Sequence, residues 1–231
     1  MSEKIDYYPA LMPGEYYHLF NRGNNRENVF YRSENTAYFL KKYNHYLLPL
    51  LDTYAYCLLP NHFHLLVRVK PVNEIIDVGA AQLPGFKNLE NLASLGDGAA
   101  IARSISEMVS NQFRLMFMSY AKAINKQEQR VGSLFQKNFK RVGVRSEAHL
   151  VNLVLYLHAN PQLHGLCDDF REWTDSSYMS HLSERHTRLC RDEVMGWFGG
   201  RAAFVQRHNS YIDWKTAGAA WIEDDADLPG F

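Results

Sequence analysis

Two histidines separated by one residue are the first feature of the sequence with clear chemical potential. His62 and His64 begin the run HFHLLVRV, whose composition is typical of a β-strand. Side chains alternate along a strand, so both imidazoles point to one face while Phe63 points into the opposite layer. Both rings can then reach one ion at the usual distance of about 2.0 to 2.1 Å. The pattern predicts a metal site that needs a further ligand, although two structural histidines would give the same pattern.

A second candidate lies on a segment that Ser146 can cap as a helix. On a helical wheel its polar stripe consists of His149, Asn152, Tyr156 and Asn160, and its apolar side of Leu150, Val151, Val154 and Leu157. Tyr156 offers a phenol, and Asn160, one turn later, an amide oxygen that could serve as the third metal ligand. We expect the apolar side to pack on a sheet and the helix to end near Asn160, because Pro161 follows.

A phenol beside a metal ion suits nucleophilic attack on a phosphodiester. A tyrosine hydroxyl ordinarily has a pKa of about 10 and is therefore protonated at neutral pH. A metal that binds a non-bridging phosphate oxygen neutralises developing charge and aligns the scissile bond with the nucleophile. The product is a phosphotyrosine link that stores the bond for later rejoining. Since the chain has 14 tyrosines, a half-buried aromatic at a helix edge is the alternative interpretation of Tyr156.

The surrounding segments predict the elements that must position these residues. They are a strand over 16–21, a helix with Ser33 as its N-cap, a hairpin of 51–59 and 62–69, a helix over 101–125, a strand or hairpin over 132–144, and the helix from 147. This order predicts an α+β fold with a ferredoxin-like antiparallel sheet covered by helices. We expect a main domain over 1–170 with an inserted loop at 71–100. Residues 171–231 should form a helical and loop extension with an acidic tail.

Composition indicates a globular protein with a local basic region. Lysine and arginine total 25, as do aspartate and glutamate, but basic residues predominate between 101 and 145. A phosphate-binding face is therefore compatible with a neutral chain, although a solvated helix face would have the same composition. The sequence has no long apolar run or secretory leader pattern, so we expect a cytoplasmic protein without membrane association. Three widely spaced cysteines suggest neither a disulfide framework nor a zinc cluster.

Four stretches carry a resemblance to a known family. They are YYHLFNRGNNRENVFYR at 16–32, YCLLPNHFHLLV at 56–67, GSLFQKNFK at 132–140 and YLHANPQLHGL at 156–166. In these stretches the chain resembles the HUH single-strand transposases with one catalytic tyrosine, specifically the REP-associated tyrosine transposases of the IS200-like group. A weaker match extends over 173–182 and 194–204. The resemblance covers most of the chain outside 71–100 and the acidic tail.

The resemblance implies a role for each candidate residue. His62 and His64 would be the metal-binding pair, Asn160 the amide ligand and Tyr156 the nucleophile. The implied activity is that of a transposase or endonuclease that cuts single-stranded DNA near a palindromic hairpin and leaves a 5′-phosphotyrosine. Mg²⁺ or Mn²⁺ suits such a ligand set better than a thiol-rich zinc site would. The candidate DNA contacts are Arg22, Gln136, Lys140 and Arg141.

Two other functions fit parts of the sequence. A relative that keeps the fold could bind hairpin DNA or RNA without cutting it, but the presence of the candidate residues named above counts against this. An unrelated metalloenzyme acting on a small molecule would not need the basic segment over 103–145. The pattern leaves open whether the protein is a monomer or a homodimer.

Overall fold

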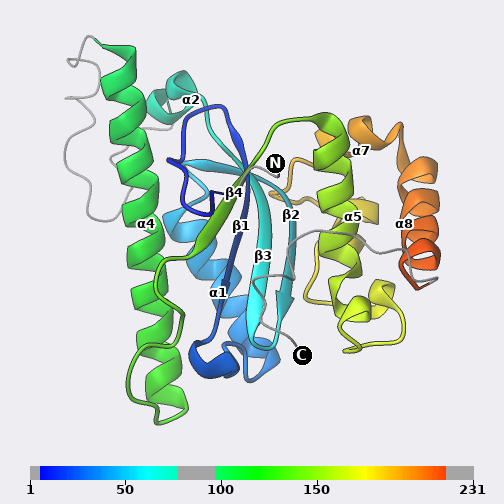
Figure 1. Cartoon of the computed structure of the whole chain (residues 1–231), viewed down its shortest axis with the longest axis horizontal. Coiled ribbons are helices and arrows are strands. Elements are labelled where there is room, and N and C mark those ends of the chain that lie inside the picture. Colours follow the sequence, from blue (N-terminus) through cyan, green and yellow to red (C-terminus); the bar gives the residue numbers. More distant parts are fainter. Residues whose placement is uncertain (1–5, 78–96, 217–231) are drawn as a thin grey trace, which may run out of the picture.

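A four-stranded antiparallel sheet is at the centre of the computed structural model, which describes residues 6–77 and 97–216 (Figure 1). Its strands are β1 (Tyr16–Arg22), β2 (Leu51–Leu59), β3 (His62–Val69) and β4 (Lys140–Val144). They lie in the order β2-β3-β1-β4. Helix α1 (Ser33–Tyr46) connects β1 to β2, and α4 (Gly98–Gln127) lies between β3 and β4 in the chain. This arrangement confirms the predicted α+β, ferredoxin-like sheet.

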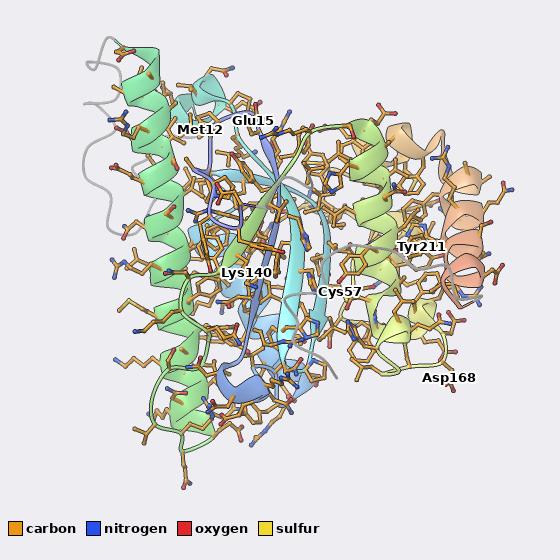
Figure 2. The ribbon with its side chains drawn as sticks, viewed as in Figure 1. Met12, Glu15, Cys57, Lys140, Asp168 and Tyr211 are labelled. Atoms are coloured by element: carbon orange, nitrogen blue, oxygen red, sulfur yellow. The ribbon has the colours of Figure 1, made fainter. Side chains whose placement is uncertain are left out.

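One face of the sheet packs against α1 and α4. Phe63, Leu65 and Val67 of β3 are buried on this face together with residues of both helices. The Phe63 ring lies 5.0 Å from the ring of Phe39 on α1, measured between centroids. Figure 2 shows the side chains that fill the space between the sheet and these helices. The predicted orientation of Phe63, away from the two histidines, is therefore confirmed.

The other face is covered by α5 (Glu147–Leu163), with α7 (Arg191–Phe198) and α8 (Arg201–Thr216) packed behind it (Figure 1). Two short helices, η3 (Phe170–Glu172) and α6 (Tyr178–Leu182), lie between α5 and α7 in the chain. Because α5 has neighbours on both sides, residues 150–161 are buried except Asn152 and Tyr156. The helix is thus a central layer of the fold.

The predicted end of α5 was wrong. Ser146 caps the helix as expected, since its hydroxyl accepts a hydrogen bond from the His149 N–H at 3.2 Å. The helix nevertheless continues through Pro161 and ends at Leu163. Pro161 has no N–H, so the helix lacks one backbone hydrogen bond at this point. The last turn of the helix is nevertheless completed by the His164 N–H, which donates to the Asn160 carbonyl at 3.0 Å. Asn160 consequently keeps its helical position one turn after Tyr156.

Three other local predictions need correction. Ser33 is the first residue of α1 and not its N-cap, and the Asn35 amide oxygen accepts from the Arg32 N–H at the start of this helix. Of the strand or hairpin predicted over 132–144, only β4 forms, and residues 132–139 are irregular. The loop predicted over 71–100 contains α2 (Val72–Asp77) and the first turn of α4. Its remaining residues, 78–96, lie outside the described residues.

The segment after α5 is attached to the edge strand β2. The Tyr56 N–H donates to the Ser177 hydroxyl at 2.9 Å, and the Trp173 indole N–H donates to the Leu58 carbonyl at 3.0 Å. The predicted domain boundary at 170 stays a prediction, and the acidic tail lies outside the described residues. All three cysteines are free. No described helix is long and apolar enough to cross a membrane.

The aromatic layer around Phe63 predicts a large effect of one core substitution. Phe63→Ala should lower the free energy of unfolding by about 3 to 5 kcal/mol, because it removes a buried ring and leaves a cavity between the sheet and two helices. Urea denaturation followed by circular dichroism measures this loss. The control Val131→Ala changes a side chain that is 97% exposed and should have an effect below about 0.5 kcal/mol. A loss below about 1 kcal/mol for Phe63→Ala would contradict this packing.

Candidate active site

The face of the sheet beneath α5 carries a cluster of histidines. His18 and Arg22 lie on β1, and His62 and His64 on β3, with His62 directly opposite Arg22. All four side chains are at most 5% exposed. The ring centroids of His62 and His64 are 5.2 Å apart, and the rings are nearly perpendicular. The alternation of strand side chains therefore brings the predicted histidine pair together on one face.

Hydrogen bonds at Nδ1 determine whether Nε2 of His62 and of His64 carries a proton. His62 Nδ1 lies 2.6 Å from the Asn61 amide oxygen. An amide oxygen only accepts, so His62 Nδ1 carries the proton and Nε2 keeps its lone pair. His64 Nδ1 lies 2.9 Å from His18 Nε2, and the same tautomer results if His64 is the donor. Both Nε2 atoms are buried without a hydrogen-bond partner. An unprotonated Nε2 can donate its lone pair to a metal cation.

Helix α5 adds the two other predicted residues to this cluster. The Tyr156 ring lies 5.7 Å from the His64 ring and 6.3 Å from the His18 ring, measured between centroids. Asn160 is completely buried, and neither atom of its amide makes a hydrogen bond of normal geometry. Tyr156 and Asn160 of the polar stripe thus face the sheet, whereas Asn152 is exposed. The apolar residues predicted to pack on the sheet share one buried cluster with sheet residues. They are Leu150, Val151, Val154 and Leu157, and the sheet residues include Ala55, Leu66 and Val144.

Burial keeps the histidines of this cluster neutral. Burial lowers the pKa of His62 to about 3, helped by the charge of Arg22 and by His164, while the amide of Asn160 acts in the opposite direction. The pKa of His18 is also lowered to about 3, by burial and by His149. Burial and the neighbouring histidines lower the pKa of His64 well below 6.5. Metal ligation requires neutral imidazoles, and these are neutral at pH 7.

The available ligand atoms define what kind of ion would fit. His62 Nε2, His64 Nε2 and the Asn160 amide oxygen are buried polar atoms without partners, and such atoms are costly unless something binds them. No three His, Cys, Asp or Glu side chains in the described part of the chain are arranged to hold an ion. An ion would therefore need substrate oxygens or water to complete its coordination, as in catalytic sites with open positions.

Two site histidines were missed by the sequence reasoning. His18 contacts His64 directly, and His164, the residue after α5, has its ring 5.5 Å from that of His62. Both had a detectable signal. His18 shares a strand face with Arg22 because it lies four residues before it, and His164 continues the stripe of Tyr156 and Asn160 by one further turn.

The four predicted DNA contacts do not form one patch. Arg22 lies within the histidine cluster, where its charge acts on His62. Lys140, labelled in Figure 2, lies opposite Phe20 on the same face of the sheet, with its ammonium 4.8 Å from the Tyr7 ring centroid. Gln136 and Arg141 line a groove beside α4 instead. The position of Gln136 could not be predicted, because residues 132–139 have no regular alternation.

A second buried histidine cluster joins α5 to the segment behind it. His208 Nδ1 donates to the Phe204 carbonyl, so its Nε2 accepts from His158 Nδ1 at 2.8 Å. His158 Nε2 then accepts from the Ser177 hydroxyl at 2.7 Å. His181 lies beside this chain, with its ring centroid 5.5 Å from that of His158. These contacts hold α5 against α6 and α8 and leave its other side to the candidate site.

Comparison with known proteins gives limited information. No protein-family model matches the chain, and no curated protein matches it significantly. Among solved structures, a similar chain is described as the "Structure of the REP associates tyrosine transposase bound to a REP hairpin". The two chains are 16% identical, the match covers 80% of this chain and 87% of the other, and the TM-score is 0.47. Since this likeness is weak, any function must be inferred from the site.

The buried neutral histidines predict instability in mild acid. Burial lowers the pKa of His18, His62 and His208 to about 3 and that of His181 to about 4. The unfolded chain binds protons at these side chains below about pH 6.5, whereas the folded chain does not. Their contribution to stability is therefore complete above about pH 6.5 and is lost as the pH falls towards the folded values.

Each of these histidines should remove about 1 kcal/mol from the free energy of unfolding between about pH 7 and about pH 5.5. Urea denaturation at a series of pH values measures the sum. His186→Gln is the control, because His186 is exposed and its replacement should leave the pH profile unchanged. A free energy of unfolding that is constant over this range would refute burial of the histidines in their neutral form.

Proposed function

We propose that this protein is a metal-dependent transposase or endonuclease that cleaves and rejoins single-stranded DNA near palindromic hairpins. Tyr156 is the nucleophile in this proposal, and a 5′-phosphotyrosine is the intermediate. The observation that supports it most strongly is the grouping of three buried, unpartnered ligand atoms on His62, His64 and Asn160 beside the Tyr156 ring. The family that the sequence resembles assigns roles to the same four residues.

The ligand set suits Mg²⁺ or Mn²⁺ bound to phosphate. His62 and His64 would hold the ion through Nε2, and Asn160 through its amide oxygen. Such an ion supplies charge neutralisation at a phosphate oxygen and fixes the orientation of the scissile bond. In this proposal Asn61 and His18 would support the site by accepting hydrogen bonds from Nδ1 of His62 and Nδ1 of His64, respectively. Burial beneath α5 limits the access of water to the ligand atoms.

Tyr156 would act in two balanced steps. In the first, its phenol oxygen attacks the phosphorus while the bond from phosphorus to the 3′ oxygen breaks. The phenol loses its proton and the departing 3′ oxygen gains one, so that a phosphotyrosine and a free 3′ hydroxyl are formed. In the second, a 3′ hydroxyl attacks the phosphotyrosine, which restores the phosphodiester and the phenol. Arg22, whose charge acts on His62, would attract the phosphate.

A denaturing gel tests the covalent intermediate. The protein is incubated with Mn²⁺ and a labelled single-stranded DNA that carries a hairpin with unpaired flanks. We expect a labelled protein–DNA adduct that survives denaturation, and we expect Tyr156→Phe to abolish it, because phenylalanine lacks the attacking oxygen.

The controls for this gel separate three outcomes. Tyr178→Phe removes a different buried phenol on α6 and should keep the adduct. An adduct that persists in Tyr156→Phe would disprove the nucleophile. Cleavage without any adduct would indicate hydrolysis by water, and DNA binding without cleavage in the wild type would favour a non-cleaving hairpin-binding protein.

His18 should act as a positioning residue for His64. Loss of the acceptor in His18→Leu leaves His64 Nδ1 without its partner, and we expect Mn²⁺ affinity to fall by about 10 to 100-fold. His18→Gln retains a side-chain acceptor and should lose less. Electron paramagnetic resonance of free Mn²⁺ measures this affinity independently of cleavage. Unchanged affinity in His18→Leu, in protein that melts at the wild-type temperature, would refute the role of His18.

A further inference from the structure

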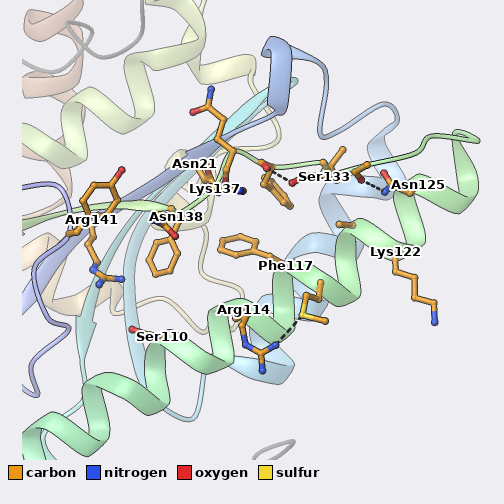
Figure 3. Close-up of a pocket in the computed structure, with 18 residues that line it drawn as sticks. Asn21, Ser110, Arg114, Phe117, Lys122, Asn125, Ser133, Lys137, Asn138 and Arg141 are labelled. Atoms are coloured by element: carbon orange, nitrogen blue, oxygen red, sulfur yellow. Dashed lines mark hydrogen bonds between the residues drawn. The ribbon is translucent and has the colours of Figure 1, made fainter.

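A groove with a volume of about 850 Å³ lies between α4 and residues 132–141 (Figure 3). It is on the face of the sheet opposite Tyr156. Asn21 of β1 lines the groove, whereas the neighbouring Arg22 points to the histidine cluster, as alternation along a strand requires. The volume of the groove falls within the range of about 300 to 1,000 Å³ that is usual for ligand sites. The groove takes no part in the chemistry proposed for Tyr156.

The groove is cationic on both walls. Arg114 and Lys122 extend from α4, and Lys137 and Arg141 lie on the opposite wall (Figure 3). Among the described residues, no aspartate or glutamate lines the groove, although the whole chain contains as many acidic as basic residues. The Arg114 guanidinium bonds the Asn111 amide oxygen instead of an acid. Two positive walls favour an extended polyanion over a single small anion.

Aromatic and amide side chains accompany these charges. Tyr8, which is 51% exposed, and the half-buried Phe139 line the groove. Their rings offer surfaces on which unpaired bases stack. The exposed amides of Gln136 and Asn138 are available to hydrogen-bond base edges. Proteins that bind single-stranded nucleic acids combine cationic side chains with aromatic rings in this way.

The irregular wall of the groove is held in place before any ligand binds. The Asn125 side chain donates to the Gly132 carbonyl at 2.8 Å, and the Asn21 side chain donates to the Gln136 carbonyl at 3.3 Å. The Gln136 N–H donates in turn to the Arg22 carbonyl at 2.8 Å. A preformed wall reduces the ordering cost of binding.

The edge strand β4 lies between the groove and the histidine face. Lys140 and Tyr7 are together on the histidine side of this edge, where the lysine ammonium lies over the tyrosine ring. Arg141 and Tyr8 line the groove on the other side. A single-stranded nucleic acid that passes over this edge of the sheet would therefore contact one cation and one aromatic ring on each side.

We propose that this groove binds the unpaired stretch of nucleic acid next to the scissile bond. Phosphates lie along Arg114, Lys122 and Lys137, and a base stacks on Tyr8. The strand then passes over β4, beside Lys140, towards Tyr156. This inference rests on the proposed function for the last part of that path, whereas binding in the groove is independent of it.

Charge reversal on α4 tests the groove with matched controls. Fluorescence anisotropy measures the affinity of the full chain, carrying Tyr156→Phe to prevent cleavage, for a labelled oligodeoxythymidine of about 12 nucleotides. Arg114→Glu and Lys122→Glu should each weaken binding by about tenfold and reduce the salt dependence. Arg103→Glu and Lys126→Glu make the same charge change at exposed positions of α4 outside the groove. These controls should lose less than about threefold.

Tyr8→Leu tests the stacking contact and should weaken binding by about fivefold or more. An oligouridine of the same length, measured in parallel, determines whether the groove prefers DNA or RNA. The proposal is overturned if the Tyr156→Phe chain without further substitutions does not bind, if all four charge reversals weaken binding equally, or if Arg114→Glu and Lys122→Glu have no effect.

The adduct gel distinguishes failure of the groove from failure of the proposed function. One outcome is that only the groove variants lose binding while the chain that retains Tyr156 forms no adduct. This would support nucleic-acid binding in the groove and refute Tyr156 as the nucleophile. An adduct on Tyr156 together with unchanged binding in the groove variants would refute the groove alone.

Discussion

The contact between α5 and the histidine face of the sheet is the interaction on which the rest of the structure depends. It buries the Nε2 atoms of His62 and His64 and the amide of Asn160 without hydrogen-bond partners. Each such atom costs about 1 to 3 kcal/mol, so a fold would not keep these four together without a compensating ligand or strong support. The two layers that enclose them provide that support, and the ion proposed here would be the ligand.

Support comes from both sides of the contact. Beneath the sheet, the aromatic layer around Phe63 fixes β3 against α1 and α4. Behind α5, the hydrogen-bonded chain from His208 through His158 to Ser177 ties the helix to α8, α6 and β2. Tyr156 and Asn160 are therefore carried by a helix that is held on two sides. A catalytic group needs this kind of fixed placement, because small displacements reduce the rate strongly.

Much of the fold could be predicted from the sequence because its periodicities are clear. The hairpin of β2 and β3 formed over the predicted residues, and the order of elements gave the correct sheet. The orientation of α5 could not be predicted from its polar stripe, because the helix is buried on both sides and polarity no longer marks its exposed face. Residues 132–139 were also beyond prediction, since side-chain amides such as that of Asn125 hold them in place of a strand ladder.

The candidate site was predicted in outline and incompletely in detail. The spacing of His62 and His64 and of Tyr156 and Asn160 identified residues that the fold brings together. His18 shares a strand face with Arg22, and His164 continues the stripe of Tyr156 and Asn160, but only the folded chain shows that their rings contact His64 and His62. The groove beside α4 could not be predicted from the sequence for the same reason. Its cations lie in two separate segments that face each other only in the folded chain.

Anomalous X-ray diffraction from crystals soaked in Mn²⁺ would show whether His62, His64 and Asn160 bind one ion. We expect one strong manganese peak within about 2.0 to 2.3 Å of His62 Nε2, His64 Nε2 and the Asn160 amide oxygen, close to the Tyr156 ring. Absence of a peak at saturating Mn²⁺, or a peak bound by other side chains with these three atoms unligated, would contradict this expectation.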